Sequence, residues 1–138
     1  MRQRIGALVM GAVLAALLLA GCQGKALPAG MEEQTLLTAG KDVMLLLVGG
    51  EYEAVYNALR EDVRASTSVQ AIQELVLAQL DGAGVYKQIE SSMATGQSSS
   101  GEEYGVAVLY CAFSKDDVLF RLAFDPDMTL IGMEIKKQ

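Results

Sequence analysis

The 138-residue chain has no histidine and no tryptophan, and it has only two cysteines and two prolines. Without histidine there is no His-dependent catalytic triad, no His-ligated metal site and no imidazole acid–base chemistry at neutral pH. The composition therefore excludes several common kinds of active site before any motif is considered.

Charge is absent from residues 5–20, which follow Arg2 and Arg4. A basic start followed by an apolar run is typical of a secretory signal peptide. As a helix, sixteen residues would reach about 24 Å, whereas a bilayer core is about 30 Å thick. The run is therefore too short for a transmembrane helix and is interpreted as a signal peptide.

Leu19, Ala20, Gly21 and Cys22 close this run. Together they resemble the lipobox of bacterial lipoproteins. The resemblance implies a diacylglycerol thioether on Cys22, cleavage just before it, and a lipid anchor on the extracytoplasmic side of the cell membrane. A plain cleaved signal peptide is the alternative, since Ala20 and Gly21 are small enough for it. The predicted organisation is a signal peptide at 1–21, a lipidated cysteine and tether at 22–30, and one domain at 31–138.

Cleavage would remove Arg2 and Arg4, leaving nine basic residues against seventeen acidic ones and a net charge of −8. Nucleic acid selects clustered positive charge, so the balance argues against a nucleic-acid partner. With Cys22 carrying lipid, Cys111 has no disulfide partner within the chain. Its apolar surroundings, residues 106–113, predict a buried thiol.

Three amphipathic segments are predicted to be helices. They are residues 31–48, residues 52–63 with an apolar stripe from Tyr52 to Val63, and a segment from Thr67 to about Gly82. Thr67 and Gln70 have the spacing of a capping box.

Beyond Gly84 the apolar period changes to two, which is typical of strands. Strands are predicted at residues 85–93, 103–113, 118–124 and 129–135, with a polar loop over residues 94–102. Helices followed by tightly connected strands predict an α+β domain, in which helices pack on one face of a curved, four-stranded antiparallel sheet.

Two segments carry a further resemblance. Residues 49–52 lie between two predicted helices, and residues 124–133 combine an Asp-Pro turn with a glycine-containing strand. Over residues 31–136 the chain resembles domain of unknown function 3887. The resemblance implies a cone-shaped, cystatin-like or nuclear transport factor 2-like fold, found in small lipoproteins and ahead of some secreted α/β hydrolases. It implies no particular chemistry, because such folds host many functions.

An enzyme on this scaffold would need an acid or base facing an apolar cavity. The candidate side chains on the predicted strands are Glu90, Glu103, Tyr104, Tyr110, Arg121 and Glu134. Arg121 and Glu134 alternate with core residues, so both are expected on a solvated face. We therefore predict no catalytic residue and no cofactor.

Two acidic pairs suggest calcium at first sight, namely Asp116 with Asp117 and Asp125 with Asp127. Each is also ordinary turn chemistry, because Asp bonds to the backbone two residues on. The surrounding residues lack the other oxygen ligands that calcium requires. No metal site is predicted.

The sequence favours a membrane-anchored, non-catalytic binding or interaction module. The alternative is a small cone-fold enzyme or a detached regulatory domain of a secreted hydrolase. The strand over residues 103–113 is apolar on both faces, so one face is expected to be poorly covered in a monomer. The expected pocket or interface consists of Tyr104, Val108, Leu109 and Tyr110. The expected partner is a second copy of the chain, paired through the sheet, and the alternatives are an apolar ligand or a wall-associated molecule.

Overall fold

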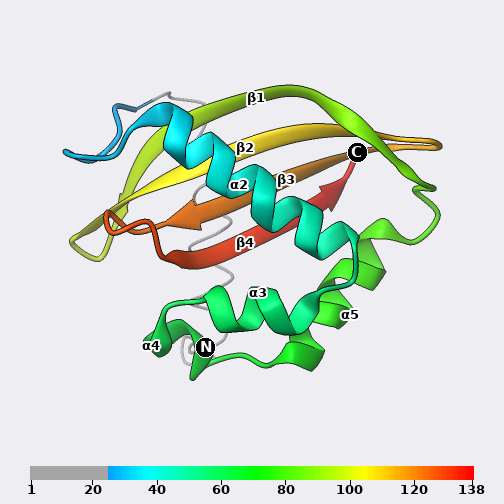
Figure 1. Ribbon diagram of the computed structural model, residues 1–138, viewed down its shortest axis with the longest axis horizontal. Coiled ribbons are helices and arrows are strands. Elements are labelled where there is room, and N and C mark those ends of the chain that lie inside the picture. The colour runs from blue at the N-terminus through cyan, green and yellow to red at the C-terminus, as the bar shows by residue number, and fades with distance from the viewer. Residues whose placement is uncertain (1–24) are drawn as a thin grey trace.

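Helices precede strands along the chain in the computed structural model, which describes residues 25–138 (Figure 1). The predicted signal peptide and Cys22 lie outside the described residues. The elements are α2 (Glu33–Val48), α3 (Tyr52–Ala58), α4 (Glu61–Arg64), α5 (Val69–Leu80), β1 (Tyr86–Ser99), β2 (Glu102–Phe113), β3 (Asp117–Phe124) and β4 (Leu130–Lys137). The predicted α+β order of helices before strands is confirmed.

The strands form one antiparallel sheet in the order β1-β2-β3-β4. In Figure 1, α2 crosses in front of the sheet, while α3 and α5 lie beside β4. We call the face that α2 covers the inner face and the opposite face the outer face. The long α2 approaches β2 closely at Gly40, where a Cβ atom would lie only 2.5 Å from Cβ of Ala107. Glycine is therefore needed at this point of α2.

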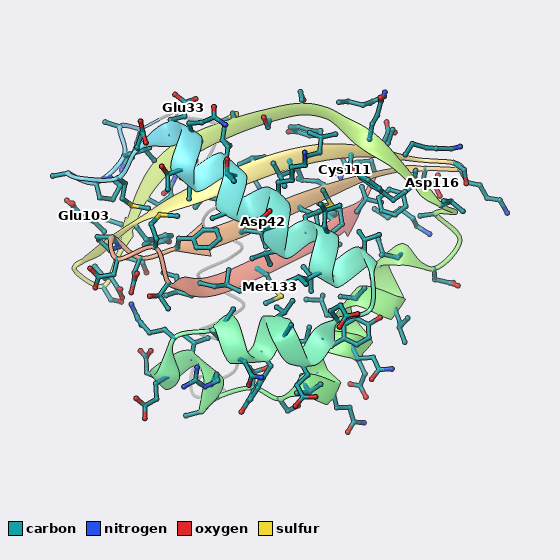
Figure 2. The ribbon with its side chains drawn as sticks, viewed as in Figure 1. Glu33, Asp42, Glu103, Cys111, Asp116 and Met133 are labelled. Carbon is teal, nitrogen blue, oxygen red and sulfur yellow. The ribbon has the colours of Figure 1, made fainter. Side chains whose placement is uncertain are left out.

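The inner face and the helices enclose the main core. Phe120, Leu36, Met44, Leu47 and Leu122 are completely buried there. Cys111 and Met133 belong to the same cluster, between the sheet and the helices (Figure 2). Burial of this much aliphatic and aromatic surface is the main source of stability in a domain of this size.

The prediction of one helix over residues 52–63 is wrong. The chain leaves the helical path at Leu59, which forms a parallel bridge with Leu130 at the start of β4. The N–H of Arg60 then donates to the carbonyl oxygen of Leu130, at 2.8 Å. Pairing with the sheet satisfies these backbone groups where the helix ends, so the stretch is divided into α3 and α4.

The predicted cap of the third helix is one residue early. Ser68, not Thr67, is the N-cap, and its hydroxyl oxygen accepts the N–H of Ala71 at 3.0 Å. Serine and threonine are both good caps, so residue type alone did not distinguish the two positions.

The predicted polar loop over residues 94–102 is also wrong. β1 continues to Ser99, and its pairing with β2 runs from Ala94 opposite Ala107 to Ser99 opposite Glu102. The turn consists of only Ser100 and Gly101, both with positive φ, at 54° and 81°. Two positive φ angles are typical of a two-residue hairpin turn. The long partner strand thus holds a serine-rich stretch in extended form despite its low strand propensity.

Residues 25–28 lie against the end of β1 instead of extending away from the domain. The N–H of Lys25 donates to Oγ1 of Thr95 at 3.1 Å, and its carbonyl accepts the N–H of Gly96 at 2.9 Å. The carbonyl oxygen of Ala26 lies 1.8 Å from the place where a Cβ of Gly96 would be. Pro28 is buried. Part of the expected tether therefore packs on the sheet.

Candidate functional site

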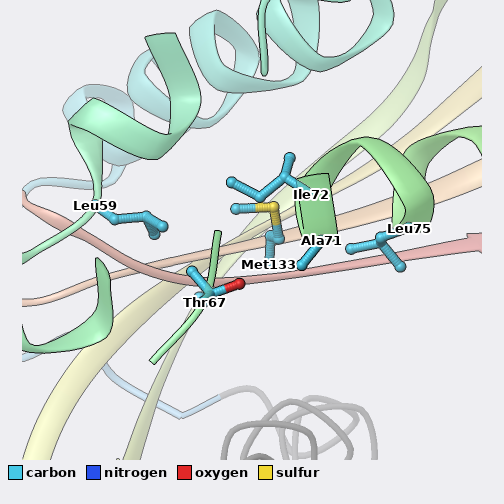
Figure 3. A pocket seen from close by; sticks show the side chains of 7 residues that line it. Leu59, Thr67, Ala71, Ile72, Leu75 and Met133 are labelled. Carbon is cyan, nitrogen blue, oxygen red and sulfur yellow. The ribbon is translucent and has the colours of Figure 1, made fainter. Parts of the chain in front are cut away.

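A small, partly open apolar cavity lies beside β4 (Figure 3). Its volume is about 130 Å³, and it is lined by Leu59, Thr67, Ala71, Ile72, Leu75, Gly132 and Met133. The hydroxyl of Thr67 is the only polar side-chain group among these residues, and none of them is ionisable. The cavity can accept a small apolar group but offers no acid, base or nucleophile at its wall.

A second apolar cluster lies on the outer face of the sheet. Its buried members are Tyr104, Val106, Val108, Leu119 and Ala123, with Ile131 packed against them. All come from strands, and no helix residue of the described chain belongs to the cluster. The helices of residues 25–138 therefore serve the inner face, and the outer cluster is formed by the sheet alone.

Two larger side chains extend this cluster toward solvent. Met93 of β1 is 39% exposed and Tyr110 of β2 is 40% exposed. Met93 is paired with Val108 and Ser91 with Tyr110, so the exposed side chains stand next to the cluster on the same face. The cluster's own buried members are 5% exposed or less, so the apolar surface that faces solvent here is that of Met93 and Tyr110. Neighbouring exposed apolar side chains are candidates for an interaction surface.

The outer face also carries one ion pair. Arg121 and Glu134 are directly opposite each other on β3 and β4, with 3.8 Å between Nε and Oε1. Neither atom has a hydrogen-bond partner. Burial raises the pKa of Glu134, and the positive charges of Arg121 and Lys136 only partly oppose this effect.

The prediction that Arg121 and Glu134 lie on a solvated face is wrong. The Arg121 side chain is only 7% exposed and that of Glu134 only 20%. Their alternation with core residues correctly placed both opposite the inner core. The error was the assumption that the opposite face is exposed to solvent, because the outer face has an apolar cluster of its own.

The four residues predicted to form a pocket or interface are divided between the two faces. Tyr104, Val108 and Tyr110 are on the outer face, whereas Leu109 is buried in the inner core against the helices. Burial, and to a smaller extent the charge of Glu102, raises the pKa of Tyr104. Leu109 is therefore part of the folding core and does not belong to the outer surface.

The remaining candidate acids lie at the surface. Glu90 of β1 and Glu103 of β2 are exposed and do not line the inner cavity (Figure 2 shows Glu103). Cys111 is 1% exposed, and burial raises its pKa to about 11. A buried thiol with a raised pKa has the character of a small apolar side chain.

Asp125 acts as turn chemistry predicts. Its Oδ1 accepts the N–H groups of Asp127 at 3.0 Å and Thr129 at 2.9 Å. No group of three or more His, Cys, Asp or Glu side chains suited to a metal ion occurs within residues 25–138.

Sequence reasoning missed the role of Arg60, which looked like one charge on the polar side of a helix. Its guanidinium pairs with Asp62, Glu102 and Asp125, at 2.8 Å between Nε and Oδ1 of Asp62 and 3.2 Å between Nη1 and Oδ2 of Asp125. These hydrogen bonds, that of Asp62 most of all, raise the pKa of Arg60. The side chain joins the helical segment to the ends of β2 and β3, and local periodicity carried no signal for such distant partners.

Helices followed by a four-stranded antiparallel open sheet define this protein as an α+β domain. Residues 41–133, more than half of the chain, match the family described as protein of unknown function (DUF3887). The chain belongs to this family, as the motifs around residues 49–52 and 124–133 predicted.

A solved structure shares the fold, the "NMR structure of protein from Ruminococcus gnavus ATCC 29149". The TM-score is 0.68 at 21% sequence identity, over 80% of this chain and 96% of that chain. No curated protein matches the sequence. Within residues 25–138 no helix is long and apolar enough to span a membrane.

Proposed function

We propose that the mature protein is an extracytoplasmic lipoprotein, held to the membrane through Cys22, that acts as a non-catalytic interaction module. The outer face of the sheet is its interaction surface. The observation that carries this role is the outer cluster, which is apolar and built from strand residues only. The inner cavity supports the non-catalytic part, because no ionisable side chain lines it.

The partner that fits the outer face is a second copy of the chain. Within residues 25–138 the outer cluster contains strand residues only, and its exposed neighbours Met93 and Tyr110 offer apolar surface to such a partner. In a face-to-face dimer with two-fold symmetry, the outer face of one copy contacts the outer face of the other. Arg121 of one copy can then pair with Glu134 of its partner, and the reverse, which gives both side chains the hydrogen bonds that they lack within one chain.

The lipid anchor is tested by Cys22→Ala in cells. Acylation requires the thiol, so the variant is expected to keep its signal peptide as an uncut precursor and to yield no acylated mature chain. Mass spectrometry of the membrane fraction measures both. A variant that is cleaved and still partitions with membranes would contradict the anchor.

The dimer is tested on the soluble domain, residues 25–138, by light scattering over a concentration series. Tyr110→Lys places an ammonium at a 40% exposed position of the outer face and is expected to give a monomer with an unchanged circular dichroism spectrum. Lys136→Ala, at an exposed position of β4, is the matched control and should dimerise like the parent. A parent domain that is monomeric at every concentration would sink the dimer.

A further inference from the structure

The position of residues 25–28 limits how far the domain can move from its anchor. Lys25 is already hydrogen-bonded to Thr95 and Gly96 of β1. Between it and Cys22 there are only Gln23 and Gly24. Three Cα–Cα steps reach at most about 11 Å. The undocked connection is therefore much shorter than the eight residues of the predicted tether.

The docked segment also fixes the edge of the sheet from which the anchor leaves. Thr95, which accepts the N–H of Lys25, is opposite Val106 and so lies on the outer face. The carbonyl of Ala26 already occupies the inner side of Gly96, and Leu27 approaches Gly105 beyond it. The chain therefore passes around β1 from the outer to the inner face, and in Figure 1 its blue start lies beside one end of β1.

The distribution of charge along β1 is a second, independent observation that bears on how the domain lies relative to a membrane. The domain is strongly acidic, yet residues 91–101 carry no charged side chain. The charges next to this stretch are Lys25, which is docked on it, and Glu102 and Glu103 of β2, opposite its far end. Ser91, Ser92, Ser98 and Ser100 are exposed along this stretch. Anionic headgroups repel carboxylates, so the neutral, hydroxyl-rich β1 edge is the side of an acidic domain that approaches a bilayer at the lowest electrostatic cost.

We propose that the β1 edge, defined as residues 91–101, is the surface that this domain turns toward the lipid headgroups, with residues 25–28 holding it there. The proposal rests on the lipid anchor at Cys22 proposed above. The sheet then stands on its β1 edge, and β4 lies about 14 Å farther from the bilayer, at three strand spacings. The exposed side chain of Tyr110 on the outer face remains accessible to a second copy anchored in the same membrane.

The test uses the full-length lipidated chain in membrane vesicles whose lipids carry a nitroxide quencher at the headgroup. A fluorophore is attached at Ser92→Cys on β1 or at Lys136→Cys on β4, both exposed positions. Cys22 is acylated and Cys111 is buried, so the label goes to the new thiol. We expect the label at position 92 to lose most of its fluorescence and the label at position 136 to keep most of it.

Two variants release the docked segment without touching Cys22. Lys25→Pro removes the N–H that Thr95 accepts, and Gly96→Val places side-chain atoms where the Ala26 carbonyl lies. Both are expected to stay in the membrane fraction and to lose the contrast between the two labels. If Gly96→Val does not fold, Lys25→Pro alone decides the point, because it leaves the strands unchanged.

Other outcomes separate the two proposals. Equal quenching at both positions in a membrane-bound parent would overturn the orientation and leave the anchor standing. Recovery of the parent in the soluble fraction would overturn the anchor itself. Weak quenching together with efficient Ser92→Cys cross-links between copies would show that β1 pairs with another chain, and this too would overturn the membrane-facing edge.

Discussion

Val108 and Leu109 are neighbours on β2, but they belong to two different environments. Leu109 faces the helices and joins a core that includes residues from α2, α3, α5 and all four strands. Val108 faces the other way and joins a cluster made only of strand residues. The chain's own helices cover one face, whereas the cluster on the other face is formed by strand residues alone.

The two faces also differ in the polar and charged groups that they contain. The buried residues of the inner cluster have no charged side chain, and its thiol is held neutral by burial. The outer face contains Arg121 and Glu134 beside valine and leucine, and Nε of Arg121 and Oε1 of Glu134 have no hydrogen-bond partner. An ion pair with unused donors and acceptors adds little to stability but a great deal to the specificity of an interface. This difference supports the proposal that the outer face, and not the inner one, contacts a partner.

The largest expected effect comes from a lysine on the inner face. Leu109→Lys would bury an unpaired ammonium among apolar side chains, so the soluble domain should fail to fold, with a circular dichroism spectrum of disordered chain. The matched change Tyr110→Lys, at the neighbouring and 40% exposed position on the outer face, should preserve the fold. If both variants fold equally well, the functional division between the faces is wrong.

Truncation of an inner aromatic ring should have the next largest effect. Phe120 is fully buried and stacks against Phe113, with 6.4 Å between ring centroids. Phe120→Ala leaves a cavity and is expected to lower the free energy of unfolding by about 3–5 kcal/mol. Urea denaturation followed by circular dichroism measures it. Leu77→Ala, at a 54% exposed position on α5, is the control and should change stability far less.

Much of this architecture could be predicted from local pattern. The apolar periodicity of α2 was sufficient to place it, because it has one continuous buried side. The run of β3 was also placed correctly, because nearly all of its residues are apolar and buried, on both faces of the sheet. The end of α3 and the full length of β1 were not predictable in this way. Leu59 is removed from its helix by Leu130, seventy-one positions away, and the serines of β1 are held by β2. Long-range pairing overrode local propensity at both places.

The candidate site shows the same division. The alternation of side chains along the strand correctly placed Val108 and Leu109 on opposite faces of the sheet. It did not indicate which of the two faces the helices would cover. The docked residues 25–28 gave no sequence signal, because their contacts are backbone hydrogen bonds and a close approach at Gly96. Features that depend on backbone geometry or distant partners were therefore the ones that sequence reasoning missed.

A smaller effect is expected from the inner thiol at alkaline pH. An unfolded Cys111 would ionise near its ordinary pKa of 9, whereas burial raises the folded value to about 11. Between these values the folded state holds more protons, so stability should fall as pH rises from about 9 to 11. Cys111→Ala should remove this part of the decline. Parallel urea titrations at pH 8, 9, 10 and 11 compare the two, and identical slopes would contradict the assignment.

The smallest expected effect, on the outer face, separates monomer from dimer. In the monomer burial raises the pKa of Glu134, so an unfolded chain releases this proton before the folded chain does as pH rises. The contribution of Glu134 to stability should therefore be lost as pH rises above the ordinary carboxyl range, and Glu134→Gln should remove this loss. In the proposed dimer the partner's Arg121 would favour the carboxylate and lower the pKa, which reverses the sign. Urea titrations between pH 4 and 7, at protein concentrations below and above the dimerisation midpoint, measure both regimes. If Glu134→Gln has the same effect at both concentrations, Glu134 takes no part in the contact between copies.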